Sequence, residues 1–520
     1  MRFLYLIATA ATVLAATPAP TTINAAPTAT TGSPTVAPAG PTTSTAPAAT
    51  TGASSTPNAC PPRVRQAWST MTPAAKALYI QAVSLGMQKG YHHRFVEIHL
   101  EPASNNEAHD NFFFYWHRAF LLAYENMLRS LGPQFACITL PFWDYATLGA
   151  NFISGGCTNM LECGPLLKDF GGSLPQGSTG PLQVTINGLE LEAANCVVSP
   201  LTQNFCQNST AFAAGKCFNC MPRNDWSQAP VPPDVNALSV FSNVLGDTPP
   251  TLEGVTSGVQ WGTHNMVHAV LDSTMGSFAS PADPVFYAHH ATTDALHAIY
   301  YNCIVAPSPP RDKTTDPRTW TDSRNYAGKT ISPTDVITMK VGEAETMPVS
   351  IWTATTSPIY PFFQGIPQTY PAYADTQGLG AYSYTYNFTG TMLDGMNSQC
   401  SAYKPPVSML LSGAKIVPKD PVAREASWLQ EATILASNYY TSQRDITHQV
   451  QMMLCVYYNE CLGGVFDYSE EFKTNFHTSK KPPCKRIIDD LAAGMTVIGV
   501  PGWERTMLKT YPCNAPSKSF

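Results

Sequence analysis

Histidine placement constrains this chain more than any other feature of its sequence. Ten of the 12 histidines lie within residues 92–297, in two groups that a long cysteine-rich stretch separates. In the second group, His264 and His268 are four residues apart, so on a helix both imidazoles would project from one face and reach one metal ion. The doublet His289-His290 lies just before a predicted helix and supplies a third candidate ligand. The second group therefore predicts a three-histidine metal site.

The first group offers a matching set in His99, His109 and His117. His117 leads into residues 118–131, where apolar side chains recur at helical spacing. Three imidazoles without a nearby thiolate or paired carboxylate suit copper or catalytic zinc, and not calcium or an iron–sulfur cluster. Two helix pairs that each direct histidines inward would form a four-helix bundle with metal ligands in its core.

The N-terminal residues are typical of a secreted protein. Arg2 is followed by a mostly apolar run that ends in small residues, which predicts a signal peptide over residues 1–16. Residues 17–57 are almost wholly Thr, Pro, Ala, Ser and Gly, a composition that buries too little apolar surface to order its backbone. We expect a disordered, O-glycosylated stalk that is either a spacer or cell-wall tether, or a passive linker. The expected location is extracellular.

Composition excludes several classes of partner. Hydrophobic residues make up 44% of the 520 residues, enough for a sizeable core. Charged residues make up only 13%, the net charge is -6, and no basic cluster stands out, so we expect no nucleic-acid partner. No stretch after the N-terminal run is long and apolar enough to span a membrane. The even number of cysteines, 14, favours an oxidised chain with disulfides.

The predicted fold is mainly α, with a four-helix bundle, long disulfide-pinned loops, some β strands and an extra C-terminal domain. The predicted domains cover residues 58–400 and 401–520. Gly, Pro, Asn and Cys are dense within 155–250, which predicts a long irregular insertion. Helical spacing returns at about Asp420. Strands are predicted at 336–341, 347–352 and 382–388, the insertion holds Cys157, Cys163, Cys196, Cys206, Cys217 and Cys220, and the C-terminal domain holds Cys455, Cys461, Cys484 and Cys513.

The histidine motifs resemble those of tyrosinases and the wider type-3 copper proteins, which include catechol oxidases and haemocyanins. The resemblance spans residues 91–301 and follows the family's order. Its motifs are Trp116-His117-Arg118, Pro141-Phe142-Trp143-Asp144, His264-Asn265 through His268, and Asp283-Pro284 through His289-His290 and Asp294.

The resemblance implies two copper ions. It assigns His99, His109 and His117 to the first ion, with His93 as an alternative to His99. The resemblance assigns His264, His268 and His290 to the second ion, with His289 beside that ion but not bound to it. Asp294 is expected either to hold a ligand imidazole or an arginine, or to be a solvated charge on its helix.

Three departures from the family pattern stand out. The spacing from His109 to His117 is one residue shorter than usual, and Asp272-Ser273 replaces the usual glycines after the helix of His268. No cysteine is placed to form the Cys-His thioether of many relatives, so we expect none.

The resemblance implies oxidation of phenolic and catecholic small molecules by O2. The expected activity is hydroxylation of monophenols to o-diphenols and oxidation of o-diphenols to o-quinones, the precursors of melanin. A phenol has a pKa near 10, so it must lose a proton on binding the metal. Asn265 and Glu253 match the places of a family Asn and Glu that hold a proton-accepting water.

Other functions stay open. The chain could be a catechol oxidase only, or a secreted protein that binds oxygen or copper without turnover. The C-terminal domain is expected either to shield the copper site as a removable part or to be a permanent accessory module.

Overall fold

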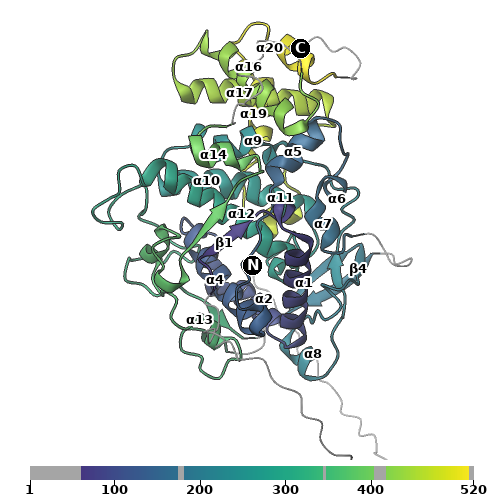
Figure 1. The fold of residues 1–520 in the computed structure, drawn as a ribbon, viewed down its shortest axis with the longest axis vertical. Helices are drawn as coiled ribbons and strands as arrows, with labels where there is room; N and C mark the ends of the chain where they lie inside the picture. Colours follow the sequence, from purple (N-terminus) through teal and green to yellow (C-terminus); the bar gives the residue numbers. More distant parts are fainter. Residues whose placement is uncertain (1–59, 174–180, 343–346, 403–416, 514–520) are drawn as a thin grey trace, which may run out of the picture. The chain divides into compact units, whose positions relative to one another are not determined.

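The predicted mainly α fold is confirmed, and four helices carry four of the six candidate ligands. They are α2 (His92–Leu100), α4 (Phe113–Ser130), α11 (Asn265–Leu271) and α12 (Val285–Tyr300) (Figure 1). His109 directly follows α3 (Pro102–Ala108), and His264 ends the π-helical turn Gln260–His264 that leads into α11. The computed structural model describes residues 60–173, 181–342, 347–402 and 417–513. The predicted signal peptide and stalk lie outside the described residues, and Ala59–Phe520 form one compact unit.

Helix α4 is the predicted amphipathic segment, but it begins earlier than the spacing indicated, at Phe113 instead of Arg118. The aromatic run before His117 continues the helix because its side chains are all buried. Nearly every side chain of α4 as far as Leu128 is buried, so this helix passes through the interior and carries His117 into it.

The doublet His289-His290 lies inside α12, not before it. Asp283 and Pro284 start the helix early, because Pro284 already has helical backbone angles and the Asp283 carboxylate accepts the Val285 N–H at 3.1 Å. Adjacent residues on an α-helix differ in direction by about 100°. His289 and His290 therefore project to different sides of α12.

The cysteine-rich insertion is pinned by disulfides as predicted, but it is not irregular throughout. Its disulfides are Cys157–Cys163, Cys196–Cys220 and Cys206–Cys217. It contains α6 (Met160–Cys163), α7 (Pro165–Asp169), the antiparallel hairpin β2 (Leu182–Ile186) and β3 (Leu189–Ala193), the antiparallel pair β4 (Asn195–Val197) and β5 (Met221–Arg223), α8 (Ser209–Ala213) and α9 (Ala237–Phe241).

The three predicted strands are present in shortened form. They are β6 (Lys340–Val341), β7 (Val349–Ser350) and β8 (Tyr384–Asn387). Each belongs to a two-stranded sheet, so the length of each strand is limited to the residues that pair with its one partner strand. The remaining helices of this part are α1 (Pro73–Gln88), α3 (Pro102–Ala108), α5 (Tyr145–Ile153), α10 (Leu252–Val259), α13 (Tyr360–Phe363) and α14 (Leu393–Gln399).

Strand β8 pairs in parallel with β1 (Arg63–Gln66). The pairing brings Tyr386 and Arg65 to Asp294 on α12, with the Asp294 carboxylate 2.5 Å and 3.1 Å from them, and Arg118 of α4 donates to the same carboxylate at 2.6 Å. Burial opposes ionisation of Asp294, but Arg118 and Arg65 hold the pKa of its carboxyl below its usual range. Asp294 is therefore not a solvated charge: it joins β1, α4 and α12 in a buried ion network.

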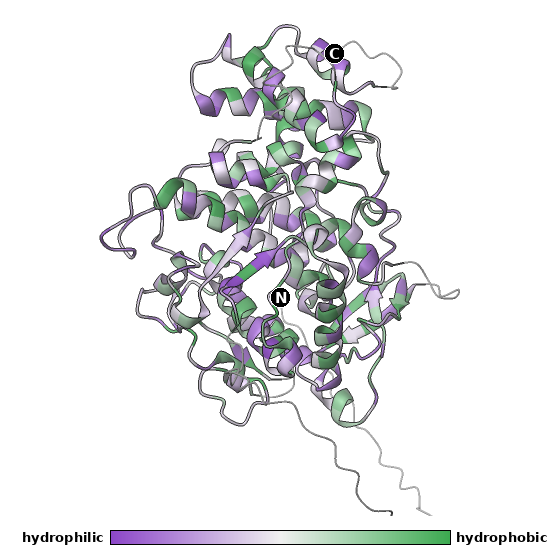
Figure 2. Cartoon of the chain, viewed as in Figure 1, coloured by the Kyte–Doolittle hydropathy of each residue, from purple (hydrophilic) through white to green (hydrophobic). Residues whose placement is uncertain are grey.

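Residues 417–513 form the C-terminal helical region. Its helices are α16 (Pro421–Ser437), α17 (Gln443–Cys461), α18 (Glu470–Asn475), α19 (Pro483–Ala492) and α20 (Trp503–Thr510). Of these, α16, α17 and α20 lie at the top of Figure 1. Asp420 caps α16 by accepting the Ala423 N–H at 2.8 Å, which fits the predicted start. Hydrophobic and hydrophilic residues interleave along these helices, as expected when one face packs (Figure 2).

Disulfides close the C-terminal helical region on itself. Cys455 bonds Cys484, and Cys461 bonds Cys513. The other five disulfides join cysteines between Cys60 and Cys400, so within the described residues none links the two parts. None of the described helices is long and apolar enough to cross a membrane.

Candidate metal centre

His99, His109 and His117 converge in the interior as predicted. Their ring centroids are 5.2 to 5.7 Å apart. The Nδ1 atom of His99 lies 2.8 Å from the Phe278 carbonyl oxygen, and that of His117 lies 2.9 Å from the Phe113 carbonyl oxygen. A carbonyl can only accept, so Nδ1 carries the proton in both rings and Nε2 keeps its lone pair. Both Nε2 atoms are buried without a hydrogen-bond partner, as a metal ligand requires.

The second group converges more tightly. The His290 Nε2 lies 3.3 Å from the Nε2 atoms of both His264 and His268. The His268 Nδ1 donates to the Met275 carbonyl at 2.6 Å, and the His264 Nδ1 lies 2.8 Å from the Asn265 Oδ1. The three Nε2 atoms thus meet at one point, while the Nδ1 atoms of two rings are held from behind.

The turn that supplies the Met275 carbonyl follows α11. Asp272 and Ser273 have φ of 52° and 51°, the left-handed region that glycine occupies without strain. The two residues that stand where the family pattern has glycines therefore have the positive φ that favours glycine. The Asn224 amide donates to the Asp272 carboxylate at 2.8 Å and supports this turn.

All six imidazoles are neutral at physiological pH. Burial lowers the pKa of His99 to about 4 and that of His268 to about 3, and it lowers the pKa of the other four well below the usual value. Neutral nitrogens in sets of three, with no carboxylate or thiolate among them, fit copper or catalytic zinc.

The two groups lie side by side. The rings of His117 and His290 stack with centroids 4.2 Å apart, and the Phe286 ring lies 4.0 Å from His290. The Phe113 ring lies 4.7 Å from the rings of both His117 and His264. Aromatic rings therefore line the space between the two groups.

His289 belongs to the same set of possible ligands as the second group. Its ring stacks on His264 at 5.2 Å, and neither of its nitrogens has a hydrogen-bond partner. His93 lies in neither group, and the pKa of this buried side chain is lowered to about 3. His92 uses both nitrogens, on the Tyr124 hydroxyl and the Ala282 carbonyl, each at 2.8 Å.

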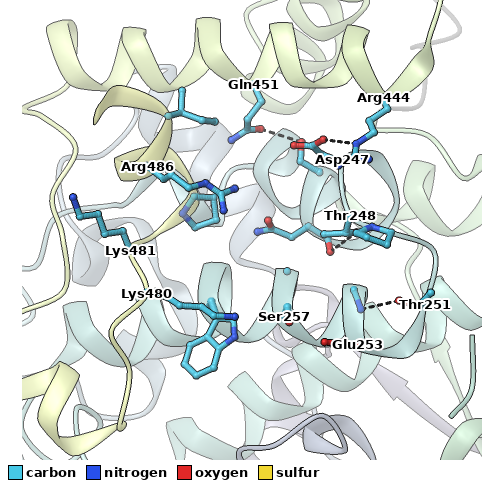
Figure 3. A pocket seen from close by; sticks show the side chains of 18 of the residues that line it. Asp247, Thr248, Thr251, Glu253, Ser257, Arg444, Gln451, Lys480, Lys481 and Arg486 are labelled. Carbon is cyan, nitrogen blue, oxygen red and sulfur yellow. Dashed lines mark hydrogen bonds and ion pairs between the residues drawn. The ribbon is translucent and has the colours of Figure 1, made fainter. Parts of the chain in front are cut away.

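The structure separates the other two predicted site residues. Asn265 is buried beside His264, with its amide nitrogen free of any partner. Glu253 is exposed in the first turn of α10 and lines a cavity of about 1000 Å³ that Arg444 and Arg486 border from the C-terminal helical region (Figure 3). Eleven residues of mostly helical chain, about 16 Å of rise, separate Glu253 from His264. Within the described part of the chain no hydrogen bond or ion pair joins Glu253 to the histidines.

Two further residues at the centre carried no recognised signal in the sequence. The Gln260 amide donates to the His109 carbonyl at 2.7 Å. Because Gln260 lies four residues before His264, this bond links the backbone of the first group to the segment that carries the second group. Phe476 comes from the strap, as we name residues 462–482 between α17 and α19. Its ring lies 5.9 Å from His109 and 5.2 Å from His268, so it contacts both groups.

The strap is held over the centre by an aromatic cluster. Tyr468, Phe472 and Phe476 pack with Met266 of α11, and the rings of Phe472 and Phe476 stack at 4.3 Å. The Tyr468 hydroxyl donates to the Trp261 carbonyl. The strap therefore contacts one histidine of each group, His109 and His268.

Comparison with known proteins agrees with the histidine geometry. Residues 89–302 match the family model described as the common central domain of tyrosinase. The grixazone synthase of Streptomyces griseus is 26% identical over 276 residues, which cover 46% of this chain and 83% of that protein. The tyrosinase of Streptomyces glaucescens is 27% identical over 252 residues, 45% of this chain and 81% of that protein.

A solved polyphenol oxidase structure from Thermothelomyces thermophila is 19% identical, with a TM-score of 0.38. The match covers 62% of this chain and 88% of that one.

Proposed function

Because this chain belongs to the tyrosinase family of copper oxidases, we propose that it oxidises o-diphenols to o-quinones with O2 at two copper ions. The observation that carries the proposal is the pair of adjacent three-nitrogen sets. The Nε2 atoms of His99 and His117 are buried without a partner, and the Nε2 atoms of His264 and His268 both face that of His290 at 3.3 Å. His99, His109 and His117 would hold one ion. His264, His268 and His290 would hold the other. When bound, the copper pair supplies the redox chemistry that links O2 to the phenol.

The protein itself orients the ligand imidazoles and lines the space between them with apolar rings. Backbone carbonyls hold the Nδ1 protons of His99, His117 and His268, so the lone pairs point inward without side-chain rearrangement. Phe113 and Phe286 line the space between the groups. A flat aromatic substrate suits a space bounded by imidazole and phenyl rings.

The direct test combines metal content with turnover. Purified protein should contain two coppers per chain and should consume O2 with catechol. His117→Ala and His268→Ala should each remove one copper and abolish oxidation, because each leaves two ligands in a set. His448→Ala is the control: His448 binds Asp247 at 3.0 Å outside both groups, so copper content should stay at two. If the purified protein contained only zinc, or contained copper but did not oxidise catechol, it would be a metal-binding protein and not an oxidase.

Monophenol hydroxylation is the second candidate activity, and Asn265 favours it. Its buried amide nitrogen has no partner and lies beside His264, so it can hold the oxygen of an incoming phenol or of a water that takes the phenol's proton. Glu253 does not enter this proposal, because it lines the separate cavity.

Asn265→Ala should therefore lower the rate with tyramine more than the rate with catechol, measured as kcat/KM on the same preparation. Equal losses would show that Asn265 only orients His264. A wild-type enzyme that oxidises catechol and never hydroxylates tyramine would be a catechol oxidase.

We also propose that the strap shields the centre and that the protein works outside the cell. Phe476 contacts both histidine groups where a phenol ring would lie, which supports shielding.

The disulfides support the extracellular location. All 14 cysteines form disulfides, an arrangement that persists in oxidising compartments. The same observation leaves no cysteine for a thioether with a ligand histidine.

A further inference from the structure

No disulfide in the described part of the chain joins the C-terminal helical region to the rest of the fold. Helix α16 packs on α5, and α17 packs on Ser242–Gly246. At the edge of this seam, Asp247 pairs with Arg444 at 3.0 Å (Figure 3). It also pairs with His448 at 3.0 Å. These partly exposed pairs contribute little. The buried part of the seam therefore decides how firmly the region stays docked.

One carboxyl group lies in that buried part. Glu425 of α16 is 0% exposed, and neither of its oxygens has a well-aligned hydrogen-bond partner. The groups that face it are the Asn236 amide and Ala237 N–H at the start of α9, Asp144 at the start of α5, Tyr458 of α17, and Tyr511 after α20.

No cation faces Glu425 among these groups. The neighbouring Arg424 donates to the Pro418 carbonyl at 2.9 Å and to the Ser154 carbonyl at 3.5 Å. An ionised carboxylate buried without a counter-charge is strongly destabilising, and weakly aligned donors offset little of that cost.

We propose that Glu425 is a proton-dependent latch: the C-terminal helical region stays docked while this carboxyl is protonated and is released when it ionises. Docking hides the neutral acid among Asn236, Tyr458 and Tyr511. Release exposes it to water, where the ionised form is well solvated.

The direction of the pH effect follows from proton linkage. Burial raises the pKa of Glu425 from the ordinary value of 4.5 to about 8 in the docked form. The docked form therefore keeps a proton that the released form gives up between those two values. Docking is at full strength below pH 4.5, weakens as the pH rises through 8, and does not weaken further through this group above that.

A second buried acid acts in the same direction. Asp234 is 0% exposed with both oxygens unpartnered, and burial raises its pKa to about 7. Tyr458 and Tyr468 of the C-terminal region lie within its electrostatic reach. If release exposes Asp234 as well, a second proton is given up and the pH dependence becomes steeper.

The test uses the copper-loaded full chain, cut once at a specific protease site placed between residues 403 and 416. Gel filtration then measures how much of the C-terminal region stays with the rest at pH 5.5 to 9. The dissociation constant should rise by up to about tenfold per pH unit for each proton released. Glu425→Gln keeps the neutral shape and should flatten this slope by one proton.

Glu431→Gln is the matched control. Glu431 lies on the same helix but is partly exposed, on Lys509 of α20, so its substitution should leave the slope unchanged. His448 is present in all three proteins, so the comparison isolates the share that belongs to Glu425. A dissociation constant that does not change with pH, or a slope that survives Glu425→Gln, overturns the proposal.

A second measurement needs no cut. The infrared C=O stretch of a protonated carboxyl should persist in the uncut wild-type protein at pH 6.5, where ordinary carboxyls are ionised. It should be weaker in Glu425→Gln, in which only Asp234 of these two buried acids remains. Its absence at pH 6.5 also overturns the latch. Neither measurement uses turnover, so the latch can fail while the oxidase activity stands.

Discussion

At the scale of single residues, the structure indicates which of the adjacent residues His289 and His290 on α12 would bind copper. The His290 Nε2 meets the Nε2 atoms of two other histidines at 3.3 Å, whereas His289 stacks against the back of His264. We expect His290→Ala to lower copper from two to one per chain, and His289→Ala to keep two.

Copper analysis of the two purified variants decides the question, and the variants are matched because both remove a buried imidazole from the same helical turn. Loss of copper from His289→Ala alone would reverse the assignment.

What sequence reasoning finds at this scale depends on how local the signal is. His264 and His268 share one helix, so their spacing alone brings them together. Glu253 also lies a few turns away, yet it does not reach Asn265, because three turns of helix carry it out of range and into the cavity of Figure 3. Phe476 reaches His109 across more than 360 residues of sequence, and no spacing rule covers that distance.

At the scale of structural elements, the strap is the part whose removal should matter most for turnover. Phe476→Ala should raise the rate with bulky catechols several-fold in the uncut chain, because it deletes the ring that contacts both histidine groups.

Phe466→Ala is the control for this change, since Phe466 packs in the same cluster without a ring contact to a ligand histidine. Initial rates at equal copper content separate the two variants. Equal rates for both, at wild-type level, would mean that the strap already leaves room for substrate.

The elements also show where sequence patterns fail. Helical spacing located the start of α16 well, since it returns at about Asp420, and Asp420 caps this helix. Alternation overstated the strands, because β6 and β7 pair only with each other and have no sheet to extend them. The start of α4 was missed because a fully buried helix has no polar face from which to read a boundary.

At the scale of the whole molecule, the disulfides predict how the chain comes apart. No described disulfide joins the C-terminal helical region to the rest, so a cut between residues 403 and 416 should allow separation without a reducing agent. Activity on bulky phenols should rise several-fold after separation at pH 9, with copper content unchanged. Native mass spectrometry without reductant checks the separation. A cut chain that separates with no gain in activity would leave the region as an accessory module.

The pairing of β1 with β8 sets an order of events during synthesis. Arg65 leaves the ribosome early, whereas Tyr384 and Tyr386, which flank it in the finished fold, follow more than 300 residues later. Until then the guanidinium lacks part of its buried surroundings, and contacts that close so long a loop form slowly. The ion network between α4 and α12 is therefore completed late: a nascent chain that stops short of Tyr384 already contains all six candidate ligands but lacks the two tyrosines that complete the network.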